Sequence, residues 1–106
     1  MEKVVIRDRR HLSTDGVVLP IVVVGRQTCR LESDPEIVSR GYPFLEGAGA
    51  QAEEVKRDIV AMIRELSPDE VRDVNILKAK VKSAVKRTLK RNDAKIPLII
   101  PVVMEV

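Results

Sequence analysis

The side chains that carry most enzyme chemistry are scarce in this sequence. It has one histidine, His11, and one cysteine, Cys29, whereas a transition-metal site usually needs three or more His, Cys or carboxylate ligands in a cluster. The glycines of residues 47–49 have the spacing of neither a dinucleotide-binding loop nor a P-loop. We interpret His11 as a solvated linker residue and Cys29 as a small apolar filler. The sequence therefore predicts no catalytic residue and no metal site.

A run of basic residues is the feature that could bind a ligand. Residues 75–91 contain seven cations and no anion. Each cation that neutralises a phosphate adds to nucleic-acid affinity and to its salt dependence. We therefore predict six RNA-binding candidates: Lys78, Lys82, Lys86, Arg87, Lys90 and Arg91. The alternative stays open that these side chains lie along an amphipathic helix and balance residues 46–70, which hold seven acids against three bases.

Two charged residues, Arg40 and Glu105, stand inside apolar segments that we expect to form strands. A buried charge has to be paired, so these two could form a structural ion pair if their strands are neighbours. Exposure on the solvent side of an alternating strand is the simpler alternative.

Length and composition limit the classes of protein. The chain has 106 residues, 44% of them hydrophobic, which suits one domain with a modest core. Aromatic residues make up 2%, which argues against the base-stacking platforms of RNA-recognition motifs. The net charge of +3 permits a polyanion partner without requiring one. The single cysteine excludes an internal disulfide, and we find neither a signal peptide nor a membrane span, so we expect a cytoplasmic protein with no membrane partner.

Hydrophobic patterns predict the elements that would position these residues. Residues 17–24 are apolar throughout and mostly β-branched, which predicts a strand, with Pro20 marking an edge position or a bulge. We predict a short return strand over residues 29–32. A third strand is predicted over residues 36–42, where Gly41 suggests a bulge or a close backbone approach.

Helical periodicity begins in the middle of the chain. Apolar residues recur with the 3.6-residue period of an amphipathic helix over residues 52–66. Ser67, Pro68 and Glu70 then have the residue types of a fresh helix start, at the N-cap, N1 and N3 positions. The second main helix is predicted over residues 74–91, with an apolar stripe on its inner side and the basic residues on the rest.

Residues 96–106 form the last apolar run. We expect a strand on which the other elements pack, with Pro97 and Pro101 at a sheet edge. The order of elements predicts an α+β fold, a small and mostly β-branched sheet of three to four strands with two helices packed on one face. Residues 1–15 are predicted to be a linker or lead-in, and residues 16–106 the domain itself.

Three pieces of the chain carry a resemblance to a known family. Residues 7–16 read RDRRHLSTDG, residues 35–42 read PEIVSRGY, and residues 97–106 read PLIIPVVMEV. In this order they resemble the patterns RDR..LS.DG, GP.IISRGF and RPMILPVIMEV of the C-terminal part of ribonuclease J. The resemblance covers nearly the whole chain, although the loop of residues 25–33 and the stretch of residues 67–75 depart from the pattern.

The resemblance implies a metallo-β-lactamase/β-CASP nuclease as the parent enzyme, acting on RNA as a 5′→3′ exonuclease and an endonuclease. The family's zinc-binding His and Asp motifs precede the matched region, so zinc is implied for the parent and no cofactor for this chain. The matched region is the family's linker and non-catalytic C-terminal domain, which supports assembly into dimers or tetramers and full activity. The implied partners are the parent's catalytic domains and further copies of the chain, with RNA as the alternative partner.

Overall fold

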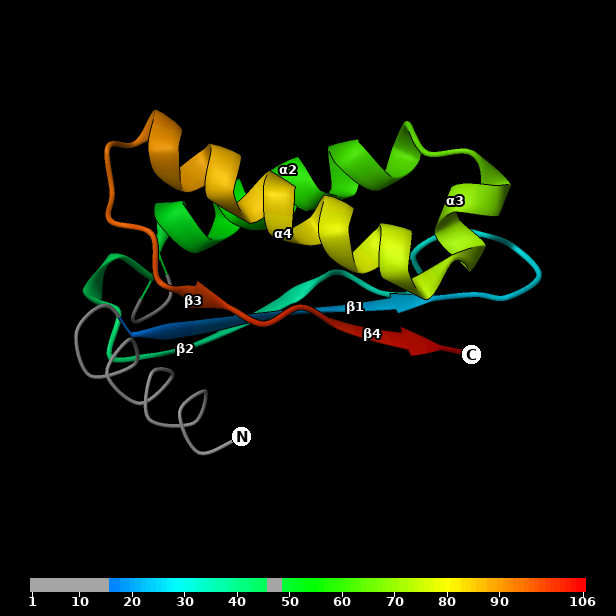
Figure 1. Cartoon of the computed structure of the whole chain (residues 1–106), viewed down its shortest axis with the longest axis horizontal. Helices are drawn as coiled ribbons and strands as arrows, with labels where there is room; N and C mark the ends of the chain where they lie inside the picture. Colours follow the sequence, from blue (N-terminus) through cyan, green and yellow to red (C-terminus); the bar gives the residue numbers. More distant parts are fainter. Residues whose placement is uncertain (1–15, 46–48) are drawn as a thin grey trace.

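The computed structural model describes residues 16–45 and 49–106. Within them, a four-stranded sheet carries three α-helices on one of its faces (Figure 1). This confirms the predicted α+β fold, with a sheet of three to four strands and its helices on one side. The predicted linker, residues 1–15, lies outside the described residues. None of the described helices is long and apolar enough to cross a membrane.

The central strand of the sheet is β1 (Val17–Val24), which pairs with every other described strand. It pairs with β2 (Glu36–Arg40) in the antiparallel sense. On its other side it pairs with β3 (Leu98–Ile99) and β4 (Val102–Glu105), both in the parallel sense. The expectation that the last apolar run organises the fold is therefore wrong, because that run forms one edge of the sheet and β1 forms its centre.

β1 is apolar on both of its sides. Val18 and Val22 point toward the helices and have 0% of their surface exposed. The intervening residues point to the other side of the sheet and stay half-buried, and they are Val17, Leu19, Ile21 and Val23. The β-branched side chains favour this extended backbone, as predicted.

The C-terminal run is split into β3 and β4 by a break at residues 100–101. The register against β1 is the same before and after the break, which places Pro20 opposite Pro101. We expected Pro20 at an edge or in a bulge, and this is wrong, since it lies in the central strand. Its missing N–H group coincides with the gap between β3 and β4, so no continuous ladder is interrupted by it.

Pro97 and Pro101 lie on the outer edge of the sheet, as predicted. The N–H groups of Leu98 and Ile100 donate to the carbonyls of Gly16, just before β1, and of Val18 in β1, over 3.1 and 2.9 Å. Because successive amides of a strand point to opposite sides, the amide positions of residues 97 and 101 face away from β1. Proline at these positions therefore costs no hydrogen bond to β1. It also removes two N–H donors with which another strand could pair.

The loop from β1 to β2 contains less regular structure than predicted. The return strand expected over residues 29–32 is reduced to a single bridge between Val24 and Leu31. β2 ends where Gly41 turns the chain with a φ of 65°, close to Gly16, whose φ is 85°. The close backbone approach predicted for Gly41 is therefore confirmed.

Two of the helices begin at side chains that satisfy their first N–H groups. α3 (Pro68–Arg72) starts with the predicted capping box, in which Ser67 and Glu70 each accept a hydrogen bond from the backbone N–H of the other. α4 (Val74–Arg91) has the predicted bounds. The Asp73 carboxylate caps α4 by accepting from two N–H groups of its first turn, over 3.0 and 3.2 Å.

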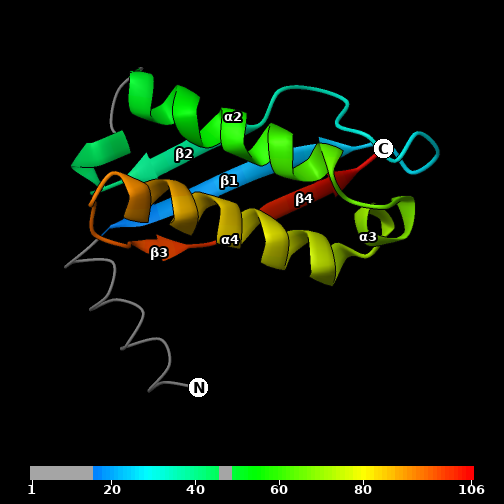
Figure 2. The same cartoon turned by 90° about the horizontal axis from the view of Figure 1, so that it is seen from above.

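The helices form a second layer above the sheet. α2 (Ala50–Arg64) lies above β2, and α4 lies beside it above the β3 and β4 side (Figure 2). The short 3₁₀ helix η1 (Pro43–Leu45) follows β2 and contacts α2. One core fills the space between the layers. Its fully buried side chains include Val18, Val22, Val55, Ile59, Leu77, Val81, Val85 and Leu89.

Candidate functional surfaces

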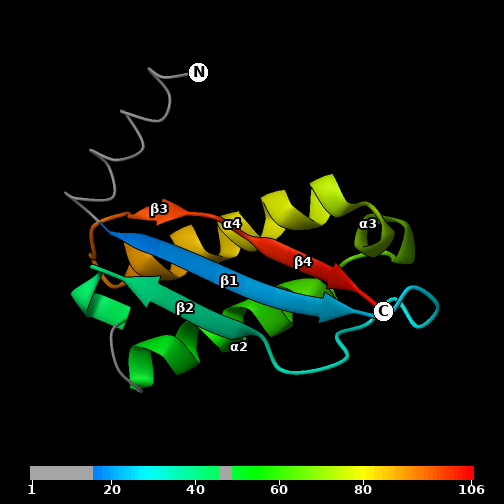
Figure 3. The ribbon, with the colours of Figure 1, turned by 90° about the horizontal axis from the view of Figure 1, so that it is seen from below.

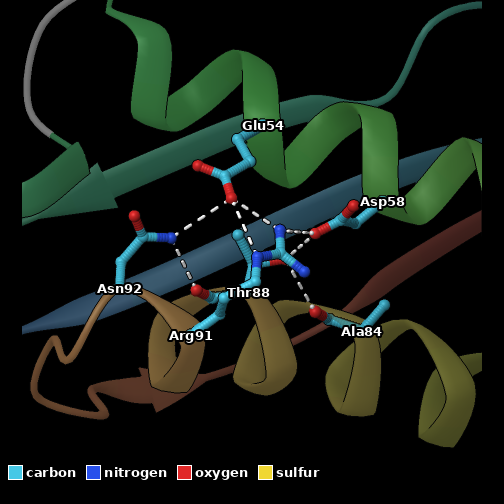
Figure 4. A network of polar contacts seen from close by, with 6 residues as sticks. All are labelled: Glu54, Asp58, Ala84, Thr88, Arg91 and Asn92. Carbon is cyan, nitrogen blue, oxygen red and sulfur yellow. Dashed lines mark hydrogen bonds and ion pairs between the residues drawn. The ribbon is translucent and has the colours of Figure 1, made fainter.

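A network of polar side chains joins α2 to α4 in the helix layer (Figure 4). Arg91 donates through its Nη2 to Glu54 over 2.5 Å and to Asp58 over 2.7 Å. Thr88, whose side chain is 0% exposed, donates its hydroxyl proton to Asp58 over 2.5 Å. The Asn92 amide adds a bond to Glu54 over 3.3 Å. We call these five residues the polar network.

The polar network favours the charged form of its two carboxylates. Hydrogen bonds from Arg91 and Asn92 lower the pKa of Glu54 from its ordinary value of 4.5. Partial burial acts to raise the pKa of Asp58, but the bonds from Thr88 and Arg91 together outweigh it, so this pKa is lowered too. The hydrogen bonds that Arg91 donates to Glu54 and Asp58 raise the pKa of its guanidinium. Arg91, which we predicted as an RNA-binding residue, is therefore already engaged in linking the helices.

The other predicted RNA-binding residues lie on two sides of α4. Arg87 lies on the α2 side, where its charge acts on Asp58. The remaining four form what we call the lysine stripe, namely Lys78, Lys82, Lys86 and Lys90. They recur at every fourth residue. Because a helix turns by about 100° per residue, the middle of the stripe lies roughly opposite Arg91, which contacts α2, so the stripe faces away from α2. No salt bridge within the described residues engages any of these four lysines.

The sheet face opposite the helices is apolar, and no described element covers it (Figure 3). We call this surface the open face. Its apolar residues are Val17, Leu19, Ile21, Val23, Val38, Leu98, Ile100, Val102 and Met104. The exposed fraction is 43% at Ile100 and 52% at Met104. Contiguous exposed apolar surface on a small domain marks a site of interaction.

Two charges border the open face, and both lie on β2. Glu36 is the register partner of Ile21, and Arg40 is the register partner of Val17. Since register partners share a face of the sheet, both charged side chains point to the open side, as Val38 between them does. The open face therefore has an apolar centre and a charged margin along β2.

The predicted pairing of Arg40 with Glu105 does not occur. Arg40 lies in β2 and Glu105 lies in β4, and these strands flank β1 on opposite sides. Both residues are exposed. The simpler alternative, two charges that face solvent, describes them.

The described residues contain no group of three or more His, Cys, Asp or Glu side chains that could hold a metal ion. Their donor set does not fit the zinc implied for the parent enzyme. Cys29 is half-buried and packs against the core, in agreement with its interpretation as an apolar filler. His11 lies outside the described residues. The fully buried polar side chain in the described part, Thr88, is used by the polar network.

Several known proteins are similar to this chain in sequence. The model of the ribonuclease J C-terminal domain matches residues 4–106. The chain belongs to this family. Ribonuclease J2 of Bacillus subtilis is 37% identical over 106 residues, which cover 97% of this chain and 19% of that relative. Ribonuclease J 2 of Staphylococcus saprophyticus is 33% identical over 107 residues, covering 97% and 18%.

A third relative is named ribonuclease J 1 rather than J2. Ribonuclease J 1 of Streptococcus pyogenes is 31% identical over 100 residues, which cover 94% of this chain and 18% of that relative. This ribonuclease J C-terminal domain therefore spans a little under a fifth of the length of the curated relatives it matches. The resemblance that we drew from three short pieces of sequence is confirmed.

The polar network and the open face were not predicted from the sequence. The polar network had a local signal, because Glu54 and Asp58 stand four residues apart on one side of α2. The open face also had a signal, because residues 17–24 lack the polar alternation of a strand with one wet side.

Proposed function

We propose that this ribonuclease J C-terminal domain is a non-catalytic module that joins copies of its parent enzyme and so supports the parent's full activity. The observation that carries the proposal is the open face, an apolar sheet surface that no described element covers. Burying apolar surface against a second copy is favourable by roughly 25 cal/mol per Å². Closed two-fold dimers are the commonest assemblies of identical chains.

The parent in this proposal is a zinc-dependent metallo-β-lactamase/β-CASP nuclease that processes RNA in the cytoplasm. It would cut RNA as a 5′→3′ exonuclease and as an endonuclease, and its catalytic domains would be further partners of this chain. Zinc would be held outside the described residues, because these lack a ligand cluster. No step of RNA cleavage is therefore assigned to a residue of this chain.

Light scattering of the chain over a range of concentrations tests the assembly role. We expect the mass of a dimer or a larger assembly. Met104→Lys should shift the mass toward the monomer, because an unpaired lysine is costly to bury in an apolar interface. Ile76→Lys is the matched control, since Ile76 is also an exposed hydrophobic residue but lies on α4. A chain that stays strictly monomeric at high concentration would contradict the proposal.

RNA binding through the lysine stripe is a second candidate function. The observation that favours it is that all four lysines are free of salt bridges within the described residues, whereas Arg91 is not. From its first to its last lysine the stripe runs about 18 Å along the helix. That length would let it face several phosphates of one strand.

Salt titration of single-stranded RNA binding tests the second candidate. Lys82→Gln with Lys86→Gln should weaken binding, and the slope of log affinity against log salt should fall by about 0.7 for each phosphate that is no longer neutralised. Arg57→Gln with Arg64→Gln on α2 removes the same charge from another surface and serves as the control. Equal effects of the two double variants would exclude a specific role for the stripe.

A further inference from the structure

The charges on β2 are equally spaced about the middle of the strand but opposite in sign. On the open face β2 presents Glu36, Val38 and Arg40 in turn. The acid and the base each lie two residues from the valine, about 7 Å away in opposite directions at the usual rise of a strand. A second copy of this strand, laid over the first in the reverse direction, would therefore place each acid over a base.

We propose that two copies of the chain stack open face to open face, about a two-fold axis that crosses the strands at Val38 and Leu19. This inference rests on the proposed function and names the surface and the register of assembly. Each strand lies over its own counterpart in the antiparallel sense, at the spacing of about 10 Å that separates stacked sheets. Glu36 of each copy faces Arg40 of the other, so two ion pairs border an apolar interface.

Charge complementarity selects this axis over the other two-fold axis that stacks the same faces. An axis parallel to the strands would place β2 of one copy over β3 and β4 of the other. The open face there presents Leu98, Ile100, Val102 and Met104. Glu36 and Arg40 would then be desolvated against apolar side chains without partners, which is unfavourable.

Side-by-side pairing at the β3 and β4 edge is a less suitable route to assembly. Pro97 and Pro101 occupy amide positions that face outward from this edge, so two of the donors that a new strand would need are missing. Native sheets use proline in this way to prevent edge pairing. Stacking through the open face needs none of these amides.

Charge reversal at the two β2 positions tests the register. Glu36→Arg and Arg40→Glu should each weaken dimerisation by about tenfold or more, because each variant places like charges opposite one another at two sites. The double variant Glu36→Arg/Arg40→Glu should dimerise like the wild type, since its ion pairs are restored with the signs exchanged. An equimolar mixture of the two single variants should recover for the same reason, as a heterodimer. Sedimentation equilibrium measures the dissociation constant in each case.

Arg57→Glu and Glu65→Arg are the matched controls, because they change the net charge equally in the helix layer. All four positions are exposed, and circular dichroism would confirm that each variant folds. A dimer that single reversals leave unchanged, or that the double variant fails to restore, would overturn the register and leave the proposed function standing. A monomeric wild-type chain would overturn both.

Discussion

The two faces of the sheet are built by the same strands but have different surroundings. On the helix side, Val18 and Val22 of β1 are 0% exposed beneath α2 and α4. On the open side, the intervening residues of β1 are half-buried, and Ile100 and Met104 of the C-terminal run are 43% and 52% exposed. Both faces are apolar, yet only one has a layer above it within the described residues.

This difference indicates that the open face is suited to being covered, and no element of residues 16–45 and 49–106 covers it. A sheet with one wet face usually alternates apolar residues inside with polar residues outside. β1 does not alternate in this way, because the residues on its open side are as apolar as those on its helix side. A connected group of polar side chains lies instead in the helix layer, where it links α2 to α4.

Substitutions of neighbouring valines on β1 should show the largest difference between the two faces. Val22→Ala should lower the free energy of unfolding by about 2–3 kcal/mol, because two methyl groups leave a closed core. Val23→Ala, on the open side, should cost under about 1 kcal/mol. Urea denaturation at a concentration that keeps the chain monomeric measures both losses. Equal losses would mean that both faces are already covered within one chain.

The polar network is a second difference between the two sides, because the open face has no ion pair in the described residues. Thr88→Val keeps the shape of the buried side chain but removes the hydroxyl donor to Asp58. We expect a loss of about 1–2 kcal/mol in the free energy of unfolding. Thr88→Ser keeps the donor and is the control. If the valine variant were as stable as the wild type, the bond would contribute nothing to the link between the helices.

The smallest expected effect is a pH dependence of the helix layer. The pKa values of Glu54 and Asp58 are lowered in the folded chain. Their contribution to stability is therefore complete above the pKa values of the unfolded chain, and it is lost as the pH falls through the lower, folded values. Arg91→Gln should reduce stability at about pH 6, and its effect should shrink as the pH falls through the lowered pKa values of the two carboxyls and they become protonated.

Urea denaturation across this pH range measures the gap in stability between the wild type and Arg91→Gln. Arg87→Gln is a suitable control, because Arg87 acts on Asp58 through its charge but makes no hydrogen bond to it. A gap that stays constant from high to low pH would show that Arg91 stabilises the helices by something other than its ion pairs.

Local patterns in the sequence predicted the helices well. α4 was predicted with both of its ends, because an apolar stripe with one helical period runs through residues 74–91 and Asn92 follows it; the Asp73 cap was found only in the structure. The capping box of Ser67 and Glu70 is likewise a signal that spans four positions. Features that depend only on neighbouring residues can be read from the order of the amino acids alone.

Strand order was not predictable in the same way. The apolar runs at both ends of the domain predict strands. They do not indicate which of these strands is central, with hydrogen-bonding partners on both sides. The polar network was missed for a related reason, because Arg91 and Asp58 are 33 positions apart and meet only when α2 and α4 lie side by side. The apolar open side of β1 was visible in the sequence, although it was interpreted only as evidence for a strand.

Isotope-filtered NMR on a mixture of labelled and unlabelled chains tests the role of the open face most directly. It detects contacts between methyl groups of different copies. We predict such contacts at Leu19, Val38 and Ile100, and none at Ile76 on α4. Intermolecular contacts confined to the helix layer, in a sample that light scattering shows to be dimeric, would contradict the assembly of this domain through its open face.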